Sequence, residues 1–137
     1  MSQYATNRVT EYRYNLDGRL VELEAHNSVT SNQVTTWTYD TTLADSGVAS
    51  KDLLRFKTYP DSTGSSDRVK CKYNRLGELI ELEDQNGTVH SYTYDKLGRL
   101  TADKVPTFGS GIDQAVKAVG RTYDARGYIE KITSYSD

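Results

Sequence analysis

Tyr94-Asp95-Lys96-Leu97-Gly98-Arg99-Leu100 is the segment from which the architecture of this 137-residue chain can be worked out. An aspartate side chain can accept hydrogen bonds from the backbone of a turn, and a glycine can adopt the positive φ that closes a tight turn with a bulge. The preceding His90-Ser91-Tyr92-Thr93-Tyr94 alternates with the period of a strand, which places Tyr92 and Tyr94 on one face. The segment therefore predicts a β-hairpin whose turn forms at Gly98.

The same unit occurs three more times along the chain. Its copies are Tyr14-Asn15-Leu16-Asp17-Gly18-Arg19-Leu20, Tyr73-Asn74-Arg75-Leu76-Gly77-Glu78-Leu79 and Tyr123-Asp124-Ala125-Arg126-Gly127-Tyr128-Ile129. Their glycines are predicted turn formers like Gly98, namely Gly18, Gly77 and Gly127. The tyrosines are predicted to form a packing ladder across neighbouring strands, made of Tyr12, Tyr14, Tyr39, Tyr73, Tyr92, Tyr94 and Tyr123. We therefore expect a repeat protein built of hairpins.

A second turn type is predicted where one hairpin follows another. In Asp84-Gln85-Asn86-Gly87-Thr88 the pair Asn86 and Gly87 is the strongest short-range signal for a hairpin turn. With this turn in place, residues 68–105 form one uninterrupted antiparallel meander.

Two regions depart from the repeat. Trp37-Thr38-Tyr39-Asp40 begins a degenerate unit in which Leu43 stands where the glycine should be, and the polar insertion 44–52 follows. Residues 112–119 have helical spacing of apolar residues, but we interpret them as a loop that feeds a strand, with one helical turn possible. We predict a single domain over residues 1–137, with units at 8–25, 34–59, 68–87, 88–105 and 116–135 and a loop at 106–115.

The spacing Tyr-Asp-x-x-Gly-Arg-Leu resembles the YD repeat of Rhs (rearrangement hot spot) proteins, teneurins and the shell components of insecticidal toxin complexes. The resemblance extends over roughly residues 8–133, and the 21-residue interval between Gly77 and Gly98 is typical of a repeat architecture. It implies an all-β fold, in which an antiparallel hairpin meander forms an open, curved or coiled sheet.

The resemblance also implies a function. Similar proteins coil a long sheet into a hollow shell that encloses a C-terminal toxin polypeptide, or serve as adhesion scaffolds at the cell surface. This chain is too short to build such a shell alone, so it resembles an excised part or a miniature relative. The self-cleaving segment of the family's shells has an Asp-Pro site, whereas the two prolines here are Pro60 and Pro106, and neither follows an aspartate. No cleavage activity is expected.

Composition favours a structural role. Leu, Val, Ile and Phe make up 27 of the 137 residues, close to the lower limit for an ordinary compact core, and eleven tyrosines compensate in part. The net charge of −2 comes from interspersed charges, which argues against a nucleic-acid partner and a membrane-surface segment. No apolar run predicts membrane insertion, and no signal peptide is recognised in the chain. The location of the chain is undetermined, and a parent protein would be secreted or at the cell surface.

Cys71 is the one candidate nucleophile. Lys70 and Lys72 could lower the pKa of its thiol, and His90 could act as its base. However, Cys71 alternates in phase with Val69 and Tyr73, so we interpret it as a small apolar residue of the packed face. We predict no catalytic residue.

Other candidate sites are weaker. Glu78, Glu81, Glu83 and Asp84 could suggest calcium, but we expect Glu81 and Glu83 to share a face with Leu79 and to form an exposed acidic stripe. His26 and His90 belong to no metal-binding spacing, and the glycine-rich residues 108–111 are interpreted as a flexible connector and not as a phosphate loop. We predict neither a metal nor a cofactor.

Three functional hypotheses follow. The first is a structural module of a toxin shell or surface protein. The alternative is a carbohydrate-binding or adhesion module, in which Trp37 and exposed tyrosines stack on sugar rings. Homo-oligomerisation through edge strands or the apolar sheet face is also expected, because an unpaired edge is a template for another strand. Residues 9–14 and 129–135 are the expected edges, and proline at Arg13 or Lys131 is expected to weaken assembly.

Overall fold

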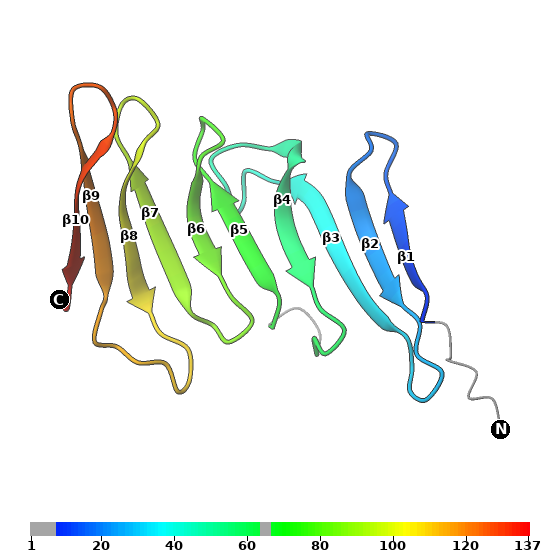
Figure 1. The fold of residues 1–137 in the computed structure, drawn as a ribbon. Helices are drawn as coiled ribbons and strands as arrows, with labels where there is room; N and C mark the ends of the chain where they lie inside the picture. The colour runs from blue at the N-terminus through cyan, green and yellow to red at the C-terminus, as the bar shows by residue number, and fades with distance from the viewer. Residues whose placement is uncertain (1–7, 64–66) are drawn as a thin grey trace.

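A computed structural model describes residues 8–63 and 67–137, which form one ten-stranded antiparallel sheet. The strands are β1 (Thr10–Tyr14), β2 (Leu20–Ala25), β3 (Gln33–Thr41), β4 (Ser50–Thr58), β5 (Val69–Tyr73), β6 (Leu79–Glu83), β7 (Val89–Tyr94), β8 (Leu100–Thr107), β9 (Ala118–Tyr123) and β10 (Ile129–Tyr135). They lie side by side in chain order, with β1 and β10 at the two ends of the sheet (Figure 1). The predicted all-β hairpin meander is confirmed.

The turns of the YD units lie along one rim of the sheet (Figure 1). They share one hydrogen-bond pattern. At β7–β8, the N–H of Asp95 donates to the carbonyl of Arg99 and the N–H of Gly98 donates to the carbonyl of Asp95, at 3.0 Å each. The Asp95 Oδ1 atom also accepts the N–H groups of Leu97 and Arg99. The glycine has φ +75°, a conformation that a residue with a Cβ adopts only with strain. Gly18, Gly77 and Gly127 also have positive φ.

The turn between β6 and β7 is not a second turn type. A two-residue Asn-Gly turn would require positive φ at both residues, but Gly87 has φ +80° while no described non-glycine residue has a positive φ. The N–H of Asp84 donates to the carbonyl of Thr88, and Asp84 Oδ1 accepts the N–H groups of Asn86 and Thr88. This is the pattern of the YD turns, with Asp84 in the place of Asp95.

A β-bulge follows each YD turn. In β7–β8, Thr93 pairs with Ala102 but Tyr94 pairs with Leu100, so that Thr101 is the extra residue. The pairs Tyr14 with Leu20, Tyr73 with Leu79 and Tyr123 with Ile129 show the same shift.

The bulge corrects one prediction about the acidic residues. Leu79 pairs with Tyr73, whereas Glu81 and Glu83 pair with Lys72 and Lys70. Paired residues lie on the same face, so Leu79 is not on the face of the two glutamates, as strict alternation had suggested.

The degenerate unit keeps the register of the others despite Leu43. Thr38 pairs with Phe56 and Tyr39 with Leu54, which is the same shift as in the YD hairpins. The connecting residues reach over the next hairpin, where the N–H of Gly47 donates to the carbonyl of Tyr73 at 2.6 Å. The insertion is therefore accommodated in the loop and at the start of β4, where the register shifts a second time between Tyr39 and Thr41.

No helix is formed anywhere in residues 8–63 and 67–137, so the described chain holds no helix able to cross a membrane. The segment with helical spacing is a loop over residues 108–117 and then enters β9, as we had interpreted it. The N–H of Val105 donates to the carbonyl of Lys117 at 2.8 Å, so the strand pairing extends into this segment.

The sheet is a single layer with a very small core. Among the described residues, the buried apolar side chains are Cys71, Tyr73 and Ala118. The register places one set of aromatic side chains on a common face, made of Tyr12, Tyr14, Trp37, Tyr39, Tyr73, Tyr92, Tyr94 and Tyr123. We call it the tyrosine face. Stability in such a sheet comes from neighbouring strands rather than from a central core.

Candidate functional site

The most regular chemical feature of the tyrosine face is a link between successive hairpins. Each link is a hydrogen bond from the hydroxyl of a YD tyrosine to a backbone carbonyl of the preceding hairpin. The three links are Tyr73 to Leu54 at 2.9 Å, Tyr94 to Leu79 at 2.6 Å and Tyr123 to Leu100 at 2.7 Å. We call these bonds the tyrosine links.

The strand register explains why these carbonyls are available. The pairing of β6 with β7 includes Glu81, Leu82 and Glu83 but does not reach Leu79, which lies beyond the bulge. A backbone carbonyl in a partly buried position needs a partner, and the hydroxyl of Tyr94 supplies it. The bulge and the tyrosine link are thus parts of one device, repeated along the sheet.

The first YD unit has no such link in the described structure. Tyr14 lies on the outer strand β1 with 60% of its surface exposed. At the other end, Ile129 occupies in β10 the position of Leu79 and Leu100, and it is 53% exposed. An unlinked donor and an unlinked acceptor of the same kind therefore lie at opposite ends of the sheet.

The backbone orientation of the outer strands corrects the expected proline tests. The N–H of His26 donates to the carbonyl of Val9, and the N–H of Asn15 donates to that of Arg19, both at 2.9 Å. Alternation then directs the backbone groups of Arg13 toward β2. By the same pattern Lys131, paired with Thr122, faces β9. Proline at either position would break its own hairpin instead of blocking an open edge.

Cys71 is placed as an apolar residue. It is buried, and burial raises the pKa of its thiol, which opposes formation of the nucleophilic thiolate. His90 instead directs Nδ1 to Asp103 at 2.8 Å and stacks beside Tyr92. The flanking Lys70 and Lys72 pair on the opposite face with β6 carboxylates.

The acidic residues considered for calcium already have partners. Lys70 lies 2.8 Å from Glu83 and Lys72 lies 2.6 Å from Glu81, so these carboxylates form cross-strand ion pairs. Glu78 accepts a hydrogen bond from Asn74 at 2.6 Å, and Asp84 holds its turn. The four carboxylates are thus divided among separate structural contacts, and no described loop folds their oxygens around one point.

Sequence reasoning missed one cluster, at the end of the first hairpin. Glu11, Glu24 and His26 bring their potential ligand atoms within 4.8 Å of one another. However, the guanidinium of Arg13 lies 3.1 Å from Glu24 and 3.6 Å from Glu11. A cation from the protein itself therefore already pairs with these two carboxylates.

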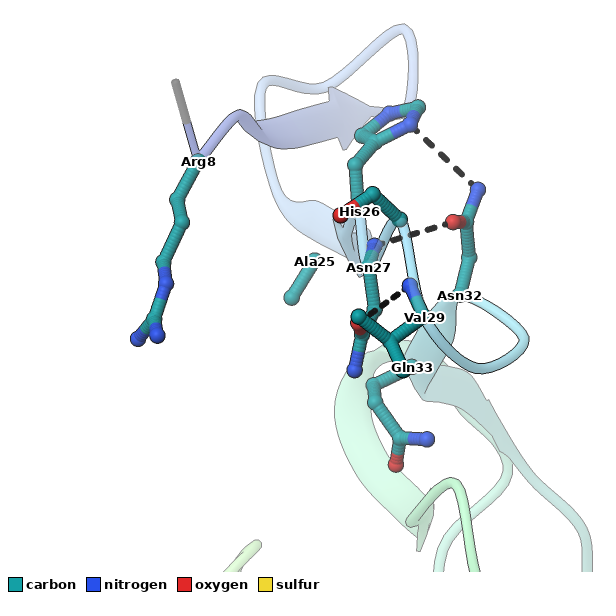
Figure 2. A pocket seen from close by; sticks show the side chains of 8 residues that line it. Arg8, Ala25, His26, Asn27, Val29, Asn32 and Gln33 are labelled. Atoms are coloured by element: carbon teal, nitrogen blue, oxygen red, sulfur yellow. Dashed lines mark hydrogen bonds between the residues drawn. The ribbon is translucent and has the colours of Figure 1, made fainter. Parts of the chain in front are cut away.

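The histidine of this cluster is also oriented against metal binding. Asn32 accepts the N–H of Asn27 with Oδ1, so its Nδ2 group faces the Nδ1 atom of His26 at 3.3 Å (Figure 2). The same Nδ2 group lies 2.8 Å from Glu24. Nδ1 of His26 must then accept, and the neutral ring carries its proton on Nε2, the atom that faces Glu11 at 3.7 Å. A pocket beside this cluster is lined by residues such as Arg8 and Val29 (Figure 2). Its turn is fixed by a hydrogen bond from the N–H of Val29 to Asn27 Oδ1.

The Trp37 ring has a cationic neighbour on the adjacent strand. The ammonium group of Lys57, its cross-strand partner, lies 5.4 Å from the centre of the indole ring and 4.4 Å from that of Tyr59. Both distances are typical of cation–π contacts, which hold the aromatic ring against its own strand neighbour.

The links, bulges and shared register define a β-hairpin repeat protein. Residues 73–106 match the family model of the RHS repeat. The match supports an Rhs/YD-repeat assignment for this segment of the chain. The search of curated proteins found none that matches the chain.

Only part of this arrangement could be found from the sequence. The turn chemistry of Asp95 and Gly98 is local, and it was predicted. The tyrosine link was not, although a signal exists, since each linked tyrosine stands four residues before a turn glycine and each YD unit has Leu or Ile two residues after that glycine. The cluster of Glu11 and His26 depends on strand pairing and has no sequence signature.

Proposed function

We propose that this chain is a non-catalytic structural module, whose function is to continue a β-sheet scaffold of an Rhs/YD-repeat shell or surface protein. The observation that carries this proposal is the tyrosine link, which joins one hairpin to the next in the same way at Tyr73, Tyr94 and Tyr123. A link that repeats in this way allows the sheet to be extended, because each hairpin presents a backbone carbonyl that can accept the tyrosine hydroxyl of the next hairpin.

The occupied side chains support the same proposal. The residues considered for catalysis or metal binding have structural partners, for example His90 with Asp103 and Lys72 with Glu81. In a parent protein, the module would contribute to a wall that encloses a C-terminal polypeptide or carries an adhesive surface. Self-association of the isolated chain follows from the same property, because the outer strands pair on one side only among the described residues.

In the carbohydrate-binding alternative, Trp37 would stack on a sugar ring while Lys57 stays 5.4 Å from the centre of the indole ring. This alternative makes a distinct prediction, namely that a soluble glycan changes the fluorescence of Trp37, the single tryptophan.

The test of the scaffold proposal is the absolute mass in solution, measured by size-exclusion chromatography with light scattering over a wide range of protein concentrations. We expect mass to rise with concentration above that of the 15.4 kDa chain. A monomer at every concentration would contradict the self-associating module. A panel of soluble glycans would be titrated against the same samples. A change in Trp37 fluorescence would favour the carbohydrate-binding alternative.

A further inference from the structure

Successive hairpins join in one register throughout the chain. Glu81, four residues after Gly77, pairs with Ser91, seven residues before Gly98. In the same way, Ala102, four residues after Gly98, pairs with Gly120, seven residues before Gly127. The degenerate unit has the same spacing. Glu22, four residues after Gly18, pairs with Thr36, seven residues before Leu43, the residue in the place of the turn glycine. The interface between hairpins is thus a fixed pattern that can be extended.

The two outer strands complement each other when this pattern is continued from β10 to the β1 strand of another copy. Lys131 then lies opposite Glu11, Ile132 opposite Thr10 and Thr133 opposite Val9. The first pair brings opposite charges together across the junction, which favours this register over one that places like charges opposite each other. The pattern was fixed by the internal hairpins, so the charge match is an independent observation.

The outward backbone groups agree with this register. Since Val9 directs its carbonyl toward β2, Thr10 and Tyr12 direct theirs away from the sheet. The bond from Val105 to Lys117 shows that the odd-numbered positions of β8, including Asp103, face the next hairpin. Ile132 occupies in β10 the position of Asp103 in β8, so Ile132 and Thr10 would exchange backbone hydrogen bonds across the junction.

The tyrosine link would also be continued. Tyr14 stands four residues before Gly18, as Tyr94 stands before Gly98, and Ile129 stands two residues after Gly127. In the extended register the hydroxyl of Tyr14 meets the carbonyl of Ile129. Both residues are more than half exposed, and so are Tyr12 at 54% and Ile132 at 59%, so the junction would also cover apolar surface.

We propose that copies of this chain associate head to tail, with β10 of one copy pairing antiparallel with β1 of the next and Tyr14 linked to the Ile129 carbonyl. This inference rests on the proposed self-association and specifies its geometry. The junction joins two different edges, so it generates open chains or rings and not a closed symmetric dimer.

The deciding experiment uses two variants, each with one edge blocked. Thr10→Pro removes an outward N–H from β1, and Ile132→Pro removes one from β10, while both leave the N–H groups that pair within the hairpins. We expect each variant alone to be monomeric in sedimentation velocity, and an equimolar mixture to form a heterodimer, because the mixture contains one intact edge of each kind. Circular dichroism establishes that both variants are folded.

The same mixture distinguishes this geometry from its rivals. If β1 paired with β1, the Ile132→Pro variant alone would still dimerise, and if β10 paired with β10, the Thr10→Pro variant alone would. Either result would overturn the head-to-tail junction while leaving self-association in place. If the unmodified chain itself stayed monomeric, the proposed function would fail together with this inference.

A charge exchange tests the junction without proline. Glu11→Lys is expected to weaken association because it faces Lys131, and the double variant Glu11→Lys with Lys131→Glu is expected to restore it. Failure of the double variant to recover association would contradict the register.

The link itself is tested by Tyr14→Phe, which keeps the ring and removes the hydroxyl. We expect the dissociation constant to rise roughly two- to tenfold, the equivalent of one lost hydrogen bond. Tyr12→Phe is the matched control on the same strand and is expected to leave association unchanged. Equal effects of the two substitutions would exclude a specific link from Tyr14.

Discussion

The hairpins from β5 to β10 and the region from β1 to β4 use the same register but are held together differently. In the first region, every YD tyrosine donates its hydroxyl to the preceding hairpin, and Tyr73 is buried. In the second, the described structure shows no hydroxyl partner for Tyr14 or Tyr39, and a long loop replaces one YD turn. The RHS repeat match falls within the linked region.

The difference teaches that strand pairing and hairpin linkage are separable. Tyr39 pairs with Leu54 in the same bulged geometry as the other YD tyrosines, although Leu43 replaces the glycine and no tyrosine link is formed. Register is therefore set by the alternation and by the ladder, whereas the link adds a bond between neighbouring hairpins. The expected stability of the chain is then uneven, with the linked region the more resistant to unfolding.

The largest contrast is expected from removing a tyrosine ring in each region. Tyr73→Ala deletes a buried ring and a hydroxyl bond, so we expect a loss of about 3–5 kcal/mol in the free energy of unfolding. Tyr14→Ala removes an exposed ring and is expected to cost less than about 1 kcal/mol. Urea unfolding at a concentration where the chain is monomeric measures both. Equal losses would remove the basis for distinguishing the two regions.

Turn geometry should come next in size. Gly98→Val places a branched side chain at φ +75° and is expected to destabilise the chain by about 1–2 kcal/mol or more. Lys96→Ala in the same turn is the control, because its φ is negative, and a change within about 0.5 kcal/mol is expected. Thermal unfolding of the two variants makes the comparison. A larger effect at Lys96 would mean that the turn depends on its side chain and not on the glycine.

A single hydroxyl should have a smaller effect that depends on the region. Tyr123→Phe leaves the Leu100 carbonyl without its donor, so we expect a loss of about 1 kcal/mol. Tyr39→Phe removes no bond of this kind and is expected to be neutral. Hydrogen exchange of the Leu100 region, compared between the two variants, shows where protection is lost. Unchanged protection in Tyr123→Phe would contradict the role of the link.

The smallest effect is expected from acid, and it should separate aspartate turns from asparagine turns. Hydrogen bonds from the backbone N–H of Arg99, together with the Arg99 guanidinium, lower the pKa of Asp95 below its ordinary value of 3.8. Because the folded carboxylate has the lower pKa, its stabilisation is complete above the unfolded value and is lost as pH falls through the folded one.

Asp95→Asn keeps the accepting oxygen, as Asn15 and Asn74 do in their own turns. We expect the variant to lose less stability than the unmodified chain as the pH falls below about 4, as measured by urea unfolding. An identical pH profile would show that the Asp95 carboxylate does not contribute to the acid response.

Local signals made much of the fold predictable. The alternation of Tyr92 and Tyr94 and the turn chemistry of Asp95 and Gly98 act within a few residues, so hairpins and an all-β meander could be predicted. The turn at Asn86 and Gly87 was assigned the wrong type, because the side chain of Asp84 accepts the backbone N–H groups of Asn86 and Thr88 and so forms the same turn as in the YD units. The face of Leu79 was wrong because a bulge interrupts alternation, and the expected proline positions were wrong because they depend on the direction of backbone groups.

The sequence by itself determined the positions of the turns, the period of the repeat and the side of each strand that carries tyrosine. Only the tertiary structure decided which carbonyl each hydroxyl of Tyr73, Tyr94 and Tyr123 meets, and that Arg13 contacts both Glu11 and Glu24. The physical reason is the distance along the chain over which each interaction acts. Turns and alternation are properties of neighbouring residues, whereas a link between hairpins exists only after two strands have paired and a bulge has left one carbonyl beyond the ladder.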